Sequence, residues 1–583
     1  MAADRRLIVV VAAALLAGPS GGQVAPEPDA PPAAPNPTAP PKSLLPDSFG
    51  PVAPPAVAAP APLPIAPAAA ADTGDAGPAA LPPPASPAID TAGLLDPALG
   101  GFGQAAFARS DGRFVAGLLR RLTTPIASRW AHITLRRALL TRAPAPPGIN
   151  PADWIAERAR VLLAMGEVDA AKALVDNLPP DRLTPRLIRV TGQAALVAAD
   201  VPGLCPVADA GGAVSPDPLW GLASAMCTAI SGDDVGGASG FETLRHGAVD
   251  PFDLQLGERI AMISGGGGRA ANLDWDAAKT ITPFRFGVAA AAGVPVPLAR
   301  LVELAAATGG TSWGWVLRAP AQAPDARAAA LAPAAALGIA SADDMVAAIA
   351  AASADLDRAA LDASPAGRLR DAYAAPTIAG RVAALRAIWT GGPDADRYAA
   401  RIETGIAAAR LPVDPAFAAD TPDLIAAMLA AGIEGRAARW WPVVARGDDA
   451  AAHAAWALLA VGANGGIAVS PARFAAFAKD VSPHRAALLL AGLQGLRATR
   501  SPAWDGPRRA AGLMRPGTSW MLAIDDAAAA GRSGEVAVLV ATGLQARWSA
   551  VPPAHLAHVV SALIAVGRGH EARMIAAEAV TRG

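Results

Sequence analysis

Apolar residues between positions 151 and 232 recur every three or four positions, in short runs that are separated by glycine or proline. This spacing puts them on one face of a helix, so the stretch predicts short amphipathic helices in antiparallel pairs. In the first pair, one helix ends at Gly166, where a residue without a Cβ takes the left-handed conformation. We expect Asp153 to cap the start of that helix, because its carboxylate can accept unpaired backbone N–H groups.

The junction at Gly166 occurs again further along the chain. Each copy has an apolar helix end, a glycine, and an alanine five residues later; the pairs are Gly166 and Ala171, Gly432 and Ala437, and Gly567 and Ala572. The alanine is expected because antiparallel helices joined by a tight turn approach closely at that point. Spacings of 34 residues from Gly166 to Asp200 and from Asp200 to Asp234 add a local period, typical of helix–turn–helix repeats.

This junction resembles the turn between the two helices of a tetratricopeptide repeat, which has the same apolar–x–x–Gly–x–x–x–x–Ala arrangement. The resemblance covers residues 151–180, 422–444 and 553–583. The chain departs from the family where the first helix usually carries an aromatic residue, at Leu162, Met428 and Leu563. The resemblance implies an all-α fold, a right-handed solenoid of helical hairpins, with an extended surface for protein partners.

The N-terminal region predicts export. Arg5 and Arg6 precede an apolar run from Leu7 to Ala17 and then small residues up to Gly22, which is the pattern of a secretory signal peptide over residues 1–22. The run is shorter than the roughly 20 residues that span a bilayer, so we expect no stable membrane span in the mature chain. The predicted location is the periplasm.

The rest of the chain divides by composition. Residues 23–98 are rich in proline and alanine, which predicts a disordered arm without a packed core. We expect a helical lead-in over 99–149, a first repeat lobe over 150–375 and a second over 376–583. Valine and isoleucine are scattered through helical patterns instead of alternating runs, so almost no sheet is expected.

The charge balance excludes one class of partner. The net charge is −1, whereas nucleic-acid binding needs a concentrated basic surface. Four arginines form a local basic patch, which we interpret as a solvated face: Arg120, Arg121, Arg136 and Arg137.

The chain has two cysteines, Cys205 and Cys227. We place Cys205 in the second helix of one hairpin and Cys227 in the first helix of the next, over residues 218–230. Such helices are neighbours in a solenoid, and in an exported protein a lone pair at this range predicts a disulfide bond. The alternative is a pair of buried free thiols.

One motif suggests hydrolytic chemistry. Gly310–Gly314 fits the pattern Gly-x-Ser-x-Gly, in which Ser312 would be the nucleophile on a sharp turn between a strand and a helix. Asp343 or Asp414 and His453 follow in the order of a catalytic triad. The residues before the motif have a helical pattern and not a strand, so we interpret the motif as a loop between hairpins.

Two further groups of residues have a functional and a structural interpretation. His555, His558 and His570 would suit zinc or copper if they converged, but Glu571 is the only acid nearby, so we interpret them as polar surface. Trp313, Trp315, Trp440 and Trp441 would anchor a ligand on a binding face. They also suit the gaps between alanine-rich helices, and we favour that role.

These patterns predict an exported helical-repeat scaffold that mediates protein–protein interaction in the bacterial cell envelope. No catalytic, cofactor-binding or metal-ligating residue is assigned. The alternatives are an envelope hydrolase that uses Ser312 or a His-based metal site, and a structural spacer whose working part is the Pro-rich arm.

Overall fold

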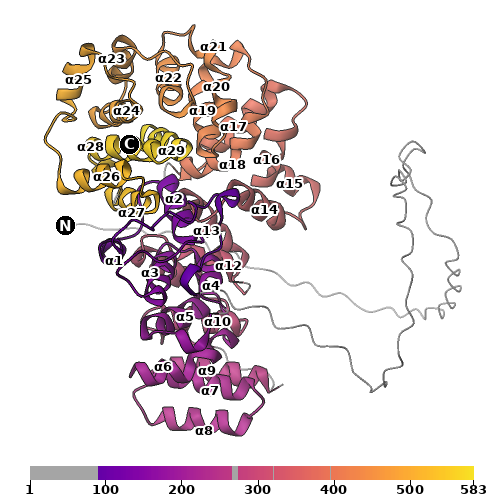
Figure 1. Ribbon diagram of the computed structural model, residues 1–583. Coiled ribbons are helices and arrows are strands. Elements are labelled where there is room, and N and C mark those ends of the chain that lie inside the picture. The colour runs from indigo at the N-terminus through magenta and orange to yellow at the C-terminus, as the bar shows by residue number, and fades with distance from the viewer. Residues whose placement is uncertain (1–88, 177, 266–272, 320, 394–395, 546) are drawn as a thin grey trace, which may run out of the picture. The chain divides into compact units, whose positions relative to one another are not determined.

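A computed structural model describes residues 89–583 except 177, 266–272, 320, 394–395 and 546. In these ranges the chain is all-α, with packed helical hairpins and no strand, as predicted (Figure 1). Two isolated β-bridges join Leu95 to Thr141 and Ile126 to Gln545. The predicted signal peptide lies outside the described residues, as does the predicted arm up to residue 88. The arm was expected to reach residue 98, but Ile89 is already buried in the core.

Two short helices open the described chain, η2 (Ile89–Thr91) and η3 (Pro97–Leu99). The helices of the first half are α1 (Gly112–Arg121), α2 (Arg129–Leu140), α3 (Pro151–Ala164), α4 (Val168–Val175), η4 (Pro180–Arg182), α5 (Pro185–Val197), η5 (Pro202–Val207), α6 (Ala208–Val214), α7 (Leu219–Ile230), α8 (Asp234–Arg245), α9 (Pro251–Ser264), α10 (Pro283–Ala291), α11 (Leu298–Ala307), α12 (Trp313–Arg318) and α13 (Pro324–Leu337).

The second half contains α14 (Ala342–Ala352), α15 (Arg358–Ala363), α16 (Pro365–Ala374), α17 (Ile378–Thr390), α18 (Arg397–Ala409), η7 (Pro415–Asp420), α19 (Thr421–Ala430), α20 (Glu434–Ala438), α21 (Trp441–Val444), α22 (Ala450–Gly462), α23 (Pro471–Lys479), α24 (Pro483–Gly495), η8 (Pro502–Trp504), α25 (Asp505–Ala510), α26 (Ser519–Ala529), α27 (Ser533–Gly543), η9 (Trp548–Ala550), α28 (Pro553–Ala565) and α29 (Gly569–Arg582). The lobe boundary expected after residue 375 falls in the turn between α16 and α17, which pack on each other.

Many helices begin with the same two-residue signal, a small polar residue followed by proline. The polar side chain accepts a backbone N–H of the first turn, and proline suits the first helical position because its missing N–H would have no partner there. Asn150, Thr184, Asp250, Thr282, Ser470 and Ser482 all precede such a proline. The prediction that Asp153 caps α3 was therefore wrong: Asn150 does so, and Asp153 accepts the hydroxyl of Thr184 at 2.7 Å.

In the first half of the chain, the later helices pack back on the earlier ones in reverse order. The helices from α3 to α9 pack in sequence, and α10 then packs on α5, α12 on α4, and α13 on α2. The helices α10, α12 and α13 thus cover the earlier helices α5, α4 and α2. The apolar side chains of α5 to α10 form one of the cores.

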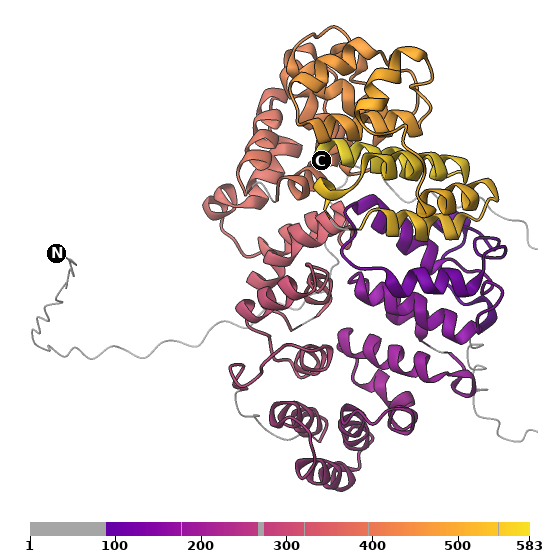
Figure 2. The ribbon, with the colours of Figure 1, turned by 90° about the vertical axis from the view of Figure 1, so that its left-hand side faces the viewer.

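The last helices pack against the first ones. α27 and α29 both contact α2, and α27 also contacts α1, so the indigo and yellow ends of the described helices lie side by side in Figures 1 and 2. The largest core contains buried residues from both ends, including Leu135 of α2, Val538 of α27 and Ile575 of α29. A simple solenoid leaves its first and last repeats apart, so the repeat pattern alone does not predict this closure.

One buried carboxylate holds the closure together. Glu578 of α29 is 2% exposed and accepts the hydroxyl of Ser128 at 2.6 Å and the backbone N–H of Arg129 at 2.9 Å. It also accepts a guanidinium N–H of Arg582 at 2.6 Å. Its negative charge therefore lies at the N-terminus of α2, where the helix dipole favours an anion.

The junction glycines adopt the expected backbone. Gly166, Gly432 and Gly567 have φ of 82°, 77° and 78°, and the alanine that follows each is fully buried. In each turn the next N–H bonds the carbonyl five residues back, for example Glu167 to Leu162 at 2.9 Å, which closes the helix end.

The same turn occurs at Ala199, whose φ is 56° although it is not glycine. Asp200 N–H there bonds the carbonyl of Ala195 at 2.9 Å. The left-handed residues are thus Gly166, Ala199 and Gly232, which are 33 residues apart. The period of 34 predicted from Asp200 and Asp234 is longer by one residue.

Replacing Ala199 with glycine is expected to stabilise the protein by about 1 kcal/mol, because a Cβ is strained in the left-handed conformation. Urea unfolding of the mature chain measures the change. Ala198→Gly is the matched control: Ala198 has φ of −79° and ψ of −1°, so glycine there brings no relief and should lower stability. Equal effects at the two positions would contradict the strain.

Glu578→Ala is expected to lower the free energy of unfolding by about 3 kcal/mol, because it leaves the N-terminus of α2 and the guanidinium of Arg582 without their buried partner. Glu578→Gln keeps an acceptor oxygen of the same shape and should lose less. Urea unfolding followed by circular dichroism compares them. No loss in the alanine variant would show that Glu578 does not hold the closure.

Candidate functional site

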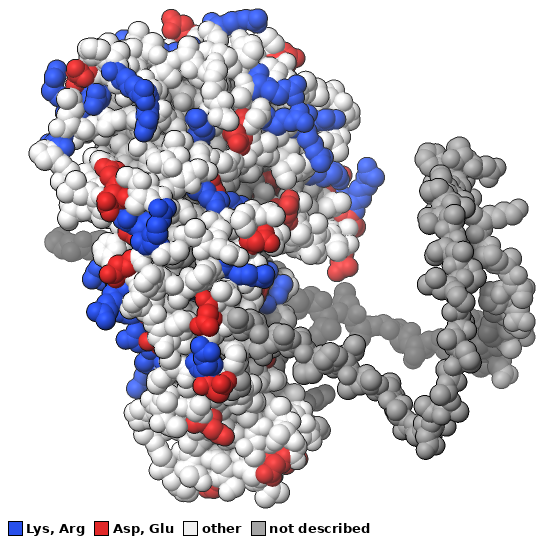
Figure 3. All heavy atoms as spheres, viewed as in Figure 1, with Lys and Arg blue, Asp and Glu red and all other residues white. Residues whose placement is uncertain are grey.

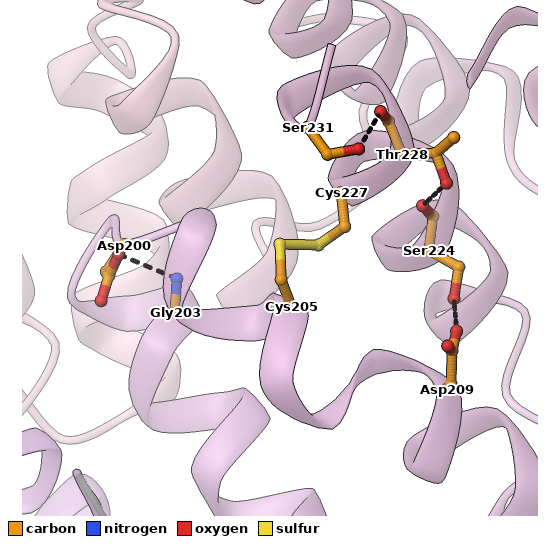
Figure 4. The surroundings of a disulfide bond; sticks show 8 residues. All are labelled: Asp200, Gly203, Cys205, Asp209, Ser224, Cys227, Thr228 and Ser231. Carbon is orange, nitrogen blue, oxygen red and sulfur yellow. Dashed lines mark hydrogen bonds between the residues drawn. A yellow bond between two sulfur atoms is a disulfide. The ribbon is translucent and has the colours of Figure 1, made fainter. Parts of the chain in front are cut away.

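The two cysteines form the predicted disulfide bond, with their Cα atoms 5.5 Å apart. Cys227 lies on α7 as expected, but Cys205 lies in the 3₁₀ helix η5 and not in the second α-helix of a hairpin. Pro202 and Pro206 account for this, because proline disrupts the regular hydrogen bonds of an α-helix. Next to the bridge, Asp209 of α6 accepts the hydroxyl of Ser224 of α7 at 3.0 Å, so the bridge has a polar neighbour (Figure 4).

The Gly-x-Ser-x-Gly motif packs against the first junction. A Cβ on Gly314 would overlap the carbonyl of Gly166, and a Cβ on Gly166 would overlap the carbonyl of Thr311. Both glycines thus permit the close contact of α12 with the turn between α3 and α4. Ser312 is 1% exposed and accepts the hydroxyl of Thr308 at 2.9 Å. The motif therefore has a packing role.

Two of the three residues considered as triad partners, His453 and Asp414, have other contacts. His453 lies 3.2 Å from a carboxylate oxygen of Asp448. Asp414 accepts the backbone N–H of Ala416 and so caps η7. Among the hydrogen bonds of the described residues, none joins Ser312 to a histidine.

The three C-terminal histidines have three different partners. His555 stacks on Trp520, with ring centroids 4.4 Å apart. His558 contacts Asp525 at 2.9 Å, and His570 contacts Glu434 at the same distance. Within the described ranges no group of three or more His, Cys, Asp or Glu is placed to hold a metal ion.

Three of the four arginines that we interpreted as a solvated face are ion-paired, and Arg121 is exposed. Arg120 lies 2.5 Å from Glu157, Arg136 lies 3.3 Å from Glu167, and Arg137 lies 3.3 Å from Glu571. The three glutamates are buried, so these arginines neutralise buried carboxylates. The pKa of Glu167 stays below its usual value because His132 and Arg136 outweigh its burial, which opposes ionisation. On the face shown in Figure 3, acidic and basic side chains are interspersed among uncharged ones.

The tryptophans mainly fill the core. Trp440 and Trp313 are buried, and Trp441 lies beneath the guanidinium of Arg473, 5.4 Å from its ring centroid. Trp315 lies against Phe286, with ring centroids 5.6 Å apart. These contacts are those of packing residues and agree with the interpretation that we favoured.

The best candidate for a binding site is an apolar groove of about 530 Å³ between α12, α13 and α14, which also reaches the start of α16. Its apolar lining includes Leu317, Ala328, Leu331, Ala348, Ile349, Ala352 and Leu356. Three charged side chains line it as well. Arg318 pairs with Asp169 at 3.0 Å, Arg327 donates to the carbonyl of Ala319 at 2.7 Å, and Asp344 forms a capping box with Ser341.

The helix α14 contributes much of the apolar surface of the groove. Every residue from Met345 to Ala352 is apolar, and a helix that is apolar on all sides is normally buried. In α14 only Met345 is fully buried, and Leu356, which follows the helix, is 40% exposed. The apolar run of α14 is the sequence signal for this groove, and none of the predictions from the sequence was based on it.

Among the described residues, no helix combines the length and the apolar character that crossing a bilayer requires. Comparison with models of known protein families, with curated proteins and with solved structures finds no match.

Removing the disulfide bond with the double variant Cys205→Ser and Cys227→Ser is expected to lower the free energy of unfolding by about 3 kcal/mol, the chain-entropy value for a loop of this length. Urea unfolding measures the loss. Reductant should bring the unaltered protein down to the same stability and leave the double variant unchanged. Two reactive thiols in the denatured protein without reductant would contradict the bond.

Proposed function

We propose that this protein is an exported helical-repeat scaffold that binds other proteins of the bacterial cell envelope. The groove between α12, α13 and α14 is its binding site, and an apolar helical segment of the partner is its ligand. The observation that carries the proposal is the apolar run of α14, which lines the groove and is mostly not buried within this chain.

The chemistry of the groove suits a helix from another protein. A groove of this kind binds the apolar face of an amphipathic helix through side chains three and four residues apart. The volume of about 530 Å³ holds several aliphatic side chains, and the small alanines at positions 348 and 352 let a partner helix approach closely. The ion pair of Arg318 with Asp169 is half exposed, so it can exchange with a polar group of the ligand at little cost.

Two observations support export. The sequence begins with the basic and apolar pattern of a secretory signal. The bond between Cys205 and Cys227 is of a kind that persists in oxidising compartments, such as the bacterial periplasm. The envelope is therefore where we place the partner.

The repeat identity belongs to the same proposal. The turns at Gly166, Gly432 and Gly567 share one backbone conformation and one buried alanine, which supports a relationship to tetratricopeptide repeats. Proteins built from such repeats bind partners along extended surfaces, in keeping with a role as a scaffold.

Photo-crosslinking in the source cells tests the groove. With a photoreactive residue at position 356, we expect a discrete covalent adduct with an envelope protein. Ala348→Arg fills the groove with a long charged side chain, so the adduct should fall about tenfold, the effect of roughly 1.4 kcal/mol on binding.

Ala347→Arg is the matched control, since Ala347 is the exposed neighbour of Ala348 and lies outside the groove lining. The adduct should persist in this variant. An adduct that is unaffected by Ala348→Arg, or reduced equally by both variants, would contradict the assignment of the groove. Retention of the full-length chain in the cytoplasm would contradict the export.

A further inference from the structure

The protein neutralises its buried glutamates with nearby basic groups. The buried glutamates of the described chain are Glu157, Glu167, Glu535, Glu571 and Glu578. Each of them has an arginine within ion-pair distance. This follows from the cost of burying a charge, which is large unless the charge is paired.

Glu403 of α18 departs from this pattern. It is removed from most of the solvent, yet no described residue forms a hydrogen bond or an ion pair with its carboxyl group. Arg368 is the one cation that acts on it electrostatically, and it does so from beyond ion-pair distance. Burial raises the pKa of Glu403 to about 7, although Arg368 favours the charged form.

The side chain of Glu403 lines a cavity of about 300 Å³. The cavity lies between α14, α16, α17 and α18, and Met345, Arg368, Trp389 and Ala400 also line it. The indole of Trp389 is fixed, because its N–H donates to the hydroxyl of Thr404 at 2.8 Å. The lining of the cavity therefore contains a fixed indole ring and a carboxyl group that lacks a partner among the described residues.

A second carboxylate lines the same cavity. Asp396 precedes Glu403 by seven residues, which is two helical turns or about 10 Å along α18. Ala399 and Ala400 lie between them in the lining. In the part of the lining that comes from α18 and its N-cap, two alanines thus lie between the two acids, with Arg397 next to Asp396. An alkyl chain that carries a positive charge fits the alanines and the carboxyl group of Glu403.

We propose that this cavity is a binding site for a small organic cation, an alkyl ammonium or guanidinium compound, whose charged group pairs with Glu403. The alkyl part lies on Ala399 and Ala400 against Trp389. The bound cation then serves as the counter-ion of Glu403, as an arginine does for each of the five buried glutamates. The site is inferred from Glu403 and its surroundings and not from the protein-binding groove, although both sites are lined in part by α14.

The other charges around the cavity are mixed. From α16 come Arg368 and the hydroxyl of Tyr373, whose pKa is raised chiefly by burial. The start of α18 contributes Arg397 and its N-cap residue Asp396, and Arg397 has a partner of its own. The linings from α13, α14 and α17 carry no charge. Glu403 is thus the group whose ionisation sets the affinity for a cation near neutral pH.

Saturation-transfer NMR with n-butylamine and agmatine as probes tests the site on the mature protein. We expect both amines to bind and 1-butanol, the uncharged counterpart, not to bind. The affinity should rise about tenfold from pH 6 to pH 8, since a carboxyl group with a pKa near 7 goes from mostly protonated to mostly ionised. An alkyl amine stays protonated throughout this range.

Glu403→Gln keeps the shape of the side chain and removes its charge, so it should abolish both the binding and its pH dependence. Glu303→Gln is the matched control, an exposed glutamate outside the cavity, and should bind like the unaltered protein. Ala400→Leu fills the cavity without touching the carboxyl group and should also prevent binding. Binding by the glutamine variant at position 403, or none by the unaltered protein at pH 8, would overturn the proposal.

Discussion

The closure of the helical chain depends on the charge of Glu578 at the start of α2. This carboxylate comes from the last helix and is separated from Ser128 by 450 residues along the chain. On the other side of α2, Arg129 donates to the carbonyls of Ala335 and Ala340, at the end of α13. One helix N-terminus thus joins the last helix to the returning helix of the first half, and the buried carboxylate of Glu578 receives its hydrogen-bond partners there.

This closure determines where the protein can bind others. The helix α2 is covered on several sides by α3, α13, α27 and α29, so its apolar residues are buried in the core. In the described part of the chain, the helix α14 packs chiefly on α13, α16 and α18. An apolar helix with so few neighbours leaves part of its surface for another molecule, and the groove lies on that surface.

The sequence predicted the local structure well and the long-range contacts poorly. The junctions at Gly166, Gly432 and Gly567 could be predicted because a left-handed backbone favours glycine. The turn at Ala199 was missed because alanine rarely adopts that conformation. The disulfide bond could be predicted because consecutive helices of a helical repeat lie next to each other. The closure was hidden, because nothing near Glu578 in the sequence identifies Ser128 as its partner. The unpaired state of Glu403 could not be predicted either, because the absence of a partner produces no pattern in the sequence.

The groove and the cavity share the helix α14. Met345, its one fully buried residue, lines the cavity beside Glu403, while Ala348 and Ile349, one turn further along, line the groove. Side chains three and four residues apart lie on neighbouring parts of a helix surface. The helix α14 therefore lines both sites, and a molecule in the cavity would contact the helix that forms the groove. Both sites are rigid only as far as α13 and α18 hold α14, and α13 is in turn held by Arg129 at the closure.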